Sequence, residues 1–238
     1  MGLKDRLYNA RRRIFGRYDL DDPRPIAIDS PYTFYLPDSD RLQAIEPGDS
    51  VKIIVRSIPA GLKYDAERLW LEVLDISEDG ISGKLDSVPL DIPQLQYGDV
   101  IRCKRWHVID YIWKDKSKEN RFPNVPSKQR WDRCLVDCQV VDGTARVGYL
   151  YREEPDMTRD GDGYPDSGWR IRADVELLSD EEYETPNATY IAIGKVLNKD
   201  DSWLHLIDAP VGTAYLRNSE TGLFEETEFT ANRADEDT

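Results

Sequence analysis

Three aspartates gather in one short polar stretch of the sequence, and their spacing first suggests a metal site. They are Asp160, Asp162 and Asp166, in the run R-D-G-D-G-Y-P-D. A calcium loop of the EF-hand kind needs oxygen ligands at alternate positions, glycine at the sixth position and a bidentate glutamate at the twelfth. A loop counted from Asp156 has Ser167 at its twelfth position, so the bidentate ligand is missing. We therefore expect no calcium, but a connecting loop whose glycines and proline form turns and whose aspartates bind nearby backbone N–H groups.

The other residues capable of chemistry are few and scattered. Cys134 and Cys138 lie four apart in a segment with helical spacing, but the chain has only two histidines to complete a zinc site. We expect small buried thiols, as in a reducing compartment. No phosphate-binding loop and no G-x-S-x-G elbow occurs. Glu153 and Glu154 would point to opposite faces of an expected strand. We predict no catalytic residues, no metal and no cofactor.

Charge is distributed unevenly along the chain, whose net charge is −14. Residues 1–150 hold 24 basic and 24 acidic side chains, whereas residues 151–238 hold 8 basic and 22 acidic ones. An acidic C-terminal part disfavours nucleic acid and anionic membranes as its partners and favours a basic protein. We therefore expect a protein partner, with no nucleic acid and no membrane. No apolar run reaches the roughly 20 residues of a membrane span, and no secretory signal begins the chain, so we expect a cytoplasmic protein.

The pattern of apolar residues in the first half predicts one helix and then many short strands. Leu3, Leu7 and Ile14 have helical spacing among basic residues. Strand-like runs follow near 26–28 and at 32–36, 51–55, 69–74, 81–85, 99–103 and 107–113. The runs I-E-P-G-D-S-V-K-I and L-Q-Y-G-D-V-I-R-C repeat one pattern, which predicts the same Gly-Asp turn before two strands. The basic, proline-containing stretch 114–130 is a candidate linker.

The second half predicts a mixture of helices and hairpins. Residues 129–141 have helical spacing, and strands are expected at 147–152, 168–174 and 189–193. Ser179 and Glu182 predict a capping box at a helix start, and N-S-E-T-G predicts a final hairpin. The predicted fold class is α+β, with two small domains, mostly antiparallel sheets and a few short helices. The expected divisions are a basic amphipathic helix at 1–20, a β-rich accessory domain at 21–125, an α+β domain at 126–227 and a disordered acidic tail at 228–238.

Four separated motifs resemble a bacterial immunity-protein domain from polymorphic toxin systems, long catalogued as a domain of unknown function. In order along residues 140–226 they are V-G-Y-L-Y-R-E-E-P, D-S-G-W-R, a helical D-E-E-Y segment and I-D-A-P-V-G-T-A-Y-L-R. The sequence departs from the family pattern in R-A-D-V-E-L-L-S after the tryptophan and in an enlarged D-M-T-R-D-G-D-G-Y-P loop.

Residues 24–113 are similar to a second group of small bacterial domains that often accompany immunity domains. The matching pieces are Y-T-F-Y-L-P-D, P-G-D-S-V-K-I, E-R-L-W-L-E-V, G-I-S-G-K-L-D-S-V-P and Y-G-D-V-I. Both resemblances imply a binding protein that neutralises a toxin, and neither brings catalytic residues. The implied partner is a cognate, basic protein toxin acting in the cytosol, such as a nuclease, an ADP-ribosyltransferase or an NAD-consuming enzyme.

Charge alone selects the candidate contact residues. They are Asp160, Asp162 and Asp166 in the loop, and Asp180, Glu181, Glu182 and Glu184 in the capped helix. Two alternatives stay open: a hydrolase that reverses a toxin's modification, and a regulatory or adaptor module without a toxin. Neutralisation at less than one molecule per toxin would favour the hydrolase.

Overall fold

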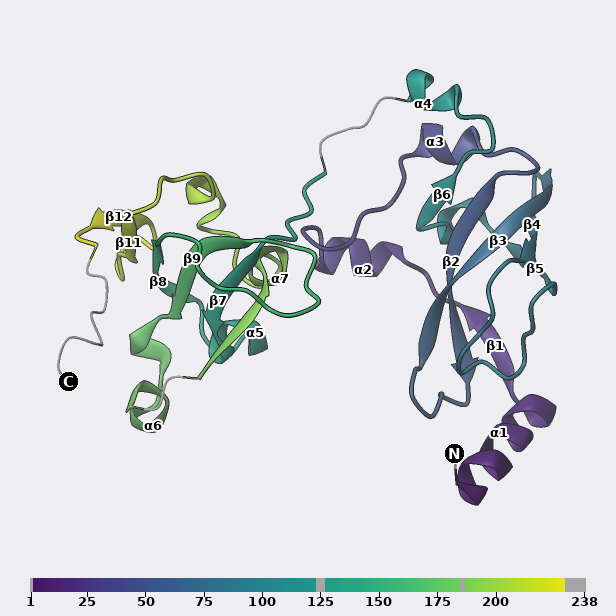
Figure 1. Ribbon diagram of the computed structural model, residues 1–238, viewed down its shortest axis with the longest axis horizontal. Helices are drawn as coiled ribbons and strands as arrows, with labels where there is room; N and C mark the ends of the chain where they lie inside the picture. Colours follow the sequence, from purple (N-terminus) through teal and green to yellow (C-terminus); the bar gives the residue numbers. More distant parts are fainter. Residues whose placement is uncertain (1, 123–126, 185–186, 230–238) are drawn as a thin grey trace. The chain divides into compact units, whose positions relative to one another are not determined.

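The computed structural model describes residues 2–122, 127–184 and 187–229 (Figure 1). The chain divides into two compact units. Unit 1 comprises Met1–Asp29 and Phe34–Ser127, and unit 2 comprises Ser30–Thr33 and Lys128–Thr238. Both units combine short helices with a mostly antiparallel sheet, so the predicted α+β class is confirmed. Among the described residues, no helix has both the length and the apolar character that a membrane span requires.

Unit 1 is built on a twisted antiparallel sheet. Its strands are β1 (Arg17–Leu20), β2 (Ser50–Ile58), β3 (Ala66–Ser77), β4 (Gly80–Leu85), β5 (Val100–Cys103) and β6 (Asp110–Ile112). Its helices are α1 (Leu3–Phe15), α2 (Arg24–Asp29), α3 (Ser39–Gln43), the 3-10 turn η1 (Arg105–His107) and α4 (Lys118–Arg121). The strand order is β1-β2-β3-β4-β5, with β6 also paired to β2. Alternate residues of the strands, such as Ile53, Leu71 and Ile101, are buried in one core.

The repeated Gly-Asp turn is confirmed in atomic detail. Gly48 and Gly98 both adopt a φ of 91°. In each turn the aspartate that follows accepts a backbone hydrogen bond from three residues earlier, Glu46 to Asp49 at 2.9 Å and Gln96 to Asp99 at 2.8 Å. Glycine is needed here because other residues avoid positive φ.

We predict that Gly98→Ala destabilises unit 1 by about 1–2 kcal/mol, because alanine must adopt a left-handed conformation. No atom lies within 4 Å of an added Cβ, so the cost arises from the backbone alone. Urea unfolding of the full chain measures it. Gly98→Asn is the control at the same position, since asparagine tolerates positive φ better. Equal losses in both variants would contradict a backbone cause.

Two expected strands of the first half are absent from the described structure. Residues 26–28 lie in helix α2, which begins beside two prolines and has an Asp22 carboxylate accepting the Arg24 backbone N–H at 3.0 Å. Residues 32–36 form no strand either, because Tyr32 belongs to unit 2. Its backbone N–H donates to Asn198 at 2.9 Å and its hydroxyl donates to Asp201 at 2.8 Å.

The expected linker 114–130 is partly structured. Its α4 belongs to unit 1, where the buried Lys118 ammonium lies 2.8 Å from Glu46 and 3.2 Å from Asp49. Residues 123–126 of this stretch lie outside the described residues, as do residues 230–238 of the expected acidic tail.

Unit 2 is built on a second six-stranded sheet, in the order β10-β7-β9-β8-β11-β12. Its strands are β7 (Arg133–Asp137), β8 (Val147–Arg152), β9 (Asp166–Ala173), β10 (Ala188–Ala192), β11 (Ala214–Arg217) and β12 (Phe224–Thr227). Its helices are α5 (Cys138–Asp142), η2 (Val175–Leu177), α6 (Asp180–Glu184), α7 (Ile193–Leu197) and η3 (Leu204–Leu206). All neighbours pair antiparallel except β7 and β9, which run parallel.

The predicted pairing of the strands on either side of the aspartate-rich loop is confirmed as β8 and β9. The Ser179 capping box and the final hairpin of β11 and β12 are also confirmed. The predicted long helix at 129–141 is wrong. Cys134 and Val136 alternate into the core from strand β7, and only Cys138–Asp142 is helical. The apolar residues of this segment are too few for the spacing of a helix to be distinguished from the alternation of a strand. The core of unit 2 lies on one side of the sheet. Trp169 and Trp203, both fully buried, meet edge to face with ring centroids 5.6 Å apart.

Candidate functional site

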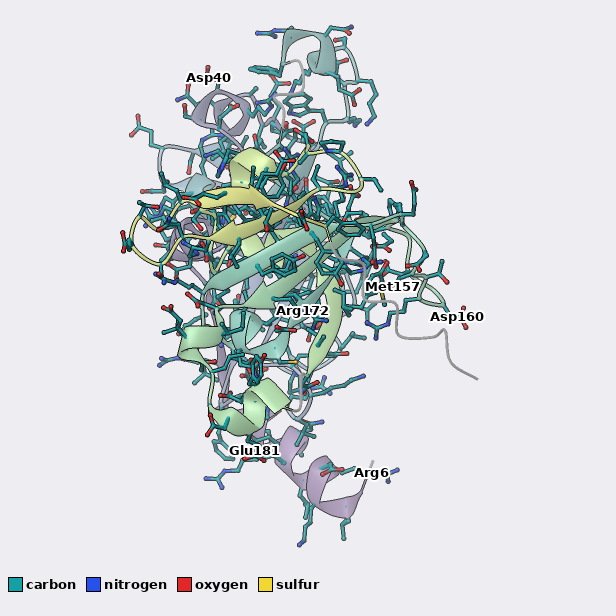
Figure 2. All side chains as sticks on the ribbon, turned by 90° about the vertical axis from the view of Figure 1, so that its left-hand side faces the viewer. Arg6, Asp40, Met157, Asp160, Arg172 and Glu181 are labelled. Carbon is teal, nitrogen blue, oxygen red and sulfur yellow. The ribbon has the colours of Figure 1, made fainter. Side chains whose placement is uncertain are left out.

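The side of the unit 2 sheet opposite its core carries two rows of side chains that cross the strands. Directly paired residues lie on the same face of a sheet, so the register assigns each row. The first row runs from Tyr190 through Leu135, Arg170 and Tyr151 to Ala214. The second row contains Arg172, Tyr149, Leu216 and Glu225. Helices α5 and α7 pack into the core on the other side, so we name this side the open face. Figure 2 looks onto it, with Arg172 near its middle.

The two rows differ in how much solvent they meet. In the first row the Arg170 side chain is only 3% exposed, and the Tyr151 ring has Phe229 5.7 Å away. In the second row Leu216 is 53% exposed, and the Arg172 guanidinium is partly exposed beside Asp137, 2.8 Å away. The second row is therefore the accessible part of the open face.

The aspartate-rich loop between β8 and β9 folds around one arginine. The Arg170 guanidinium lies 2.9 Å from Asp166 and 3.0 Å from Asp156, and it also pairs with Glu153. Burial raises the pKa of the Asp166 carboxyl, but hydrogen bonds from Arg170 and from the Gly168 and Met157 N–H groups outweigh it, so that the pKa lies below its usual value. The guanidinium supplies the positive charge that a calcium ion would supply in a calcium loop.

A second arginine fixes the tip of the loop. Arg133 holds Asp162 through two hydrogen bonds, of 2.6 and 2.8 Å, a bidentate geometry. The hydrogen bond from Arg133 is the main reason that the pKa of Asp162 is lowered. The Tyr190 hydroxyl donates to the Met157 carbonyl at 3.2 Å, so the loop lies against the margin of the open face.

The candidate contact residues chosen by charge divide into two groups. Asp160, Asp180 and Glu181 are exposed (Figure 2 labels the first and the last) and are free to meet a partner. Asp162 and Asp166 are engaged by arginines, and the Asp166 side chain is only 2% exposed. Glu182 accepts from the Ser179 N–H at 2.9 Å and so caps α6, the helix that ends at Glu184. We therefore narrow the proposed contacts in the loop and α6 to the three exposed acids, and keep Glu184 as a candidate because its side chain lies outside the described residues.

A pocket of about 650 Å³ adjoins the exposed row of the open face. Tyr149, Leu216 and Val175 supply its apolar surface. Asp174 lines it too and pairs with Arg146 at 2.8 Å. The other acidic lining residues are Glu176, Glu220, Glu225 and Glu226, of which Glu226 alternates to the side of β12 opposite Glu225. Within the described part of the chain, none of these four glutamates has a lysine or arginine partner, and Arg217, which also lines the pocket, pairs with Asp200 at 2.7 Å. An apolar floor with unpaired acids at its rim fits the alkyl stem and charged head of a lysine or arginine.

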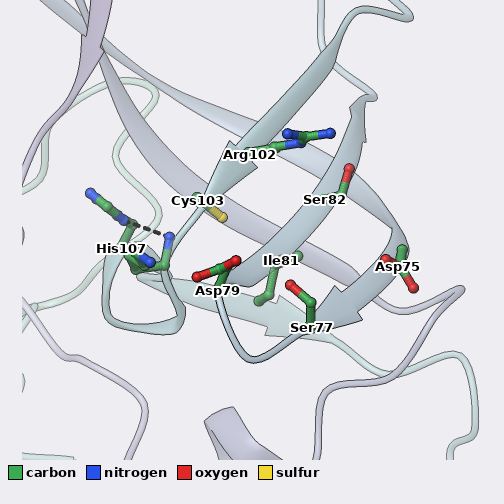
Figure 3. A pocket seen from close by; sticks show the side chains of 10 residues that line it. Asp75, Ser77, Asp79, Ile81, Ser82, Arg102, Cys103 and His107 are labelled. Carbon is green, nitrogen blue, oxygen red and sulfur yellow. Dashed lines mark hydrogen bonds between the residues drawn. The ribbon is translucent and has the colours of Figure 1, made fainter.

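Unit 1 contains a pocket of about 600 Å³ with a different character (Figure 3). It mixes the acids Asp75 and Asp79 with the bases Arg102 and His107 around Cys103. Burial raises the pKa of the Cys103 thiol to about 11, so the sulfur stays protonated at neutral pH and is a poor nucleophile. His107 accepts the Lys104 backbone N–H at 2.9 Å, the hydrogen bond drawn in Figure 3. This pocket therefore offers no activated nucleophile.

The cysteines of unit 2 do not share a helix face. Cys134 lies on β7 and is fully buried, which raises the pKa of its thiol, whereas Cys138 begins α5. Across the described residues there is no group of three or more histidine, cysteine, aspartate or glutamate side chains arranged to hold a metal ion.

Unit 2 contains a segment that matches a known protein family. Residues 134–228 match the immunity protein Imm33 domain. The match begins on β7 and extends past β12. We call residues 134–228 the Imm33 segment, and this segment contains the open face and its pocket. It confirms the resemblance of the C-terminal motifs to an immunity domain. Searches of curated proteins and of solved structures found no match to this chain.

The glutamates that line the pocket were not among the contact residues chosen from the sequence by charge. Glu225 and Glu226 stand in an acidic run that looks like the start of a disordered tail, yet they lie in strand β12. The signal that could have placed them is the hairpin turn N-S-E-T-G, which fixes their register against Leu216 and Tyr215. Glu176 joins them only through the fold, because η2 follows β9.

Proposed function

We propose that this chain neutralises a cognate protein toxin by binding it one to one through the open face of the Imm33 segment. The Imm33 match carries the proposal, since that family suggests a toxin-neutralising function. The accessible row of the open face and its acidic pocket support it, because exposed apolar side chains ringed by polar ones are common in protein interfaces.

The pocket favours binding over chemistry. The glutamates Glu176, Glu220 and Glu225 border an apolar floor, and a partner's basic side chain would neutralise them. A basic substrate cleft of a nuclease, an ADP-ribosyltransferase or an NAD-consuming enzyme has this complementary charge. We propose that the chain occludes such a cleft in the cytoplasm, without enzymatic activity, metal or cofactor. Unit 1 is proposed to be an accessory domain.

The experiment that tests this function is a titration of the toxin. The candidate toxin is the product of the neighbouring gene, and its activity is measured at increasing amounts of the full chain. Inhibition that is complete near one chain per toxin supports neutralisation by binding. Complete protection at a small fraction of one chain per toxin would instead indicate an enzyme that reverses the damage. Neither inhibition nor protection would leave a regulatory module and contradict the proposal.

Charge reversal at the rim of the pocket should weaken toxin binding. We expect Glu220→Lys combined with Glu225→Lys to lower affinity by at least tenfold at low salt, because two attractive charges become repulsive. The loss should shrink above about 0.5 M salt, where charges are screened over a few ångströms. Asp160→Lys and Glu181→Lys test the narrowed contacts in the same calorimetric titration. An affinity that is insensitive to salt and to all of these changes would contradict an acidic contact surface.

A further inference from the structure

Helix α1 is anchored to unit 1 through the side that carries Tyr8 and Arg12. The Arg12 guanidinium, 1% exposed, donates to Asp91 at 2.7 Å and to Ser57 at 2.7 Å. The Tyr8 hydroxyl donates to the Ala60 carbonyl at 3.0 Å. Tyr8 and Arg12 are four residues apart and so lie on the same side of the helix. This buried ion pair therefore fixes which side of α1 faces unit 1.

The opposite side of α1 carries an exposed apolar row. Leu3, Leu7 and Ile14 project from the same side of a helix with 3.6 residues per turn. Their exposed fractions are 76%, 64% and 71%, and Phe15 at the end of the helix is 81% exposed. Figure 1 shows α1 at the far end of β1, at the edge of unit 1. Large apolar side chains exposed together mark a surface that meets another apolar phase.

Basic side chains border the apolar row on both sides. At 100° per residue, Lys4 and Arg11 lie along one border, and Arg6 and Arg13 lie along the other. All four are exposed, and Figure 2 shows Arg6 on the helix. The helix has one acidic residue, Asp5, which accepts the Gly2 N–H at 2.9 Å and lies on the anchored side. The exposed surface of α1 is therefore basic, in a chain whose net charge is −14.

We propose that α1 lies in the surface of an anionic lipid bilayer, with its apolar row buried among the acyl chains and its basic borders on the lipid phosphates. A flat bilayer contacts the row and both borders at once, and long basic side chains reach the headgroups while their stems stay apolar. The sequence-based expectation of no membrane partner rests on the acidic charge of residues 151–238. That expectation does not take the basic side chains of α1 into account. The proposal does not rest on the proposed toxin binding, because α1 belongs to unit 1 and the open face belongs to unit 2.

Co-sedimentation of the full chain with vesicles tests the proposal. The vesicles are pure phosphatidylcholine, or phosphatidylcholine with about 30% phosphatidylserine, an anionic content at which each surface cation adds appreciably to binding. We expect binding to the anionic vesicles only, lost at high salt. Leu7→Glu with Ile14→Glu should reduce the partition coefficient by at least tenfold, and Arg6→Glu with Arg13→Glu by a similar factor.

Two control variants separate this surface from general effects. Val88→Glu adds charge at another exposed apolar residue of unit 1, and Lys195→Glu reverses a charge in unit 2; both should bind vesicles as the unchanged chain does. Circular dichroism checks that every variant is folded. Absence of binding to anionic vesicles would overturn the proposal, as would equal binding to neutral ones. A dimer that the Leu7→Glu and Ile14→Glu variant dissolves, without vesicle binding, would assign the row to self-association instead.

Discussion

Replacing Arg170 by alanine is expected to destabilise unit 2 by about 3–5 kcal/mol, the cost of leaving the buried Asp166 carboxylate without its partner. The guanidinium is 3% exposed and the Asp166 side chain 2% exposed, so the carboxylate left behind is poorly hydrated. Glu153 and Asp156 lose the same partner, and the loop between β8 and β9 loses its centre. Urea unfolding of the full chain, followed through the buried tryptophans of unit 2, measures the loss.

The same unfolding experiment, repeated at acidic pH, tests how this loss of stability changes with pH. The pKa of Asp166 is lowered in the folded chain, so its contribution to stability is present above the ordinary carboxyl pKa and is lost as the pH falls through the folded value. The difference between the Arg170→Ala variant and the unchanged chain should therefore narrow below about pH 4. Arg159→Ala, an exposed arginine of the same loop, should change stability by less than about 0.5 kcal/mol. Equal losses in both variants would show that the loop does not depend on its buried arginine.

Replacing Leu216 by arginine is expected to weaken toxin binding by about 2–4 kcal/mol, or roughly 30- to 1,000-fold, the range of an interface hot spot. Leu216 is 53% exposed at the floor of the acidic pocket, so the substitution does not disturb the core. The new guanidinium would pair with the rim glutamates and occupy the place proposed for the toxin's basic side chain. The folded stability of the variant should stay within about 0.5 kcal/mol of the unchanged chain.

A matched variant identifies the surface. Leu90→Arg makes the same change at a residue of unit 1 that is 77% exposed, and its affinity for the toxin should be unchanged. Full affinity in the Leu216→Arg variant would exclude the pocket from the interface. Equal losses in both variants would indicate a general charge effect and not a contact.

Local patterns in the sequence predict much of the fold. The amphipathic helix α1, the pairing of β8 with β9 and the Ser179 capping box are confirmed because each depends on residues near one another in the chain. Strand β7 was mistaken for helix because its five residues satisfy both periods. The entry of Tyr32 into unit 2 depends on partners more than 160 residues away, Asn198 and Asp201, which no local pattern reveals.

The candidate site was harder to predict for the same physical reason. The open face is assembled from strands in the order β10-β7-β9-β8-β11-β12, so its neighbours are distant in sequence. Charge identified Asp162 and Asp166 as prominent, but their carboxylates hold arginines of their own unit. Sequence cannot separate an acid that stabilises the fold from one that awaits a partner, because the distinction is whether a cation lies within reach.

The most direct test of toxin neutralisation is a calorimetric titration of the full chain into the neighbouring gene's toxin, with the toxin's activity assayed at each molar ratio. We predict a complex of one chain per toxin, with activity lost in step with binding and with both lost in the Leu216→Arg variant. Absence of binding while the toxin remains active, or protection far below one chain per toxin, would contradict neutralisation by the open face of the Imm33 segment.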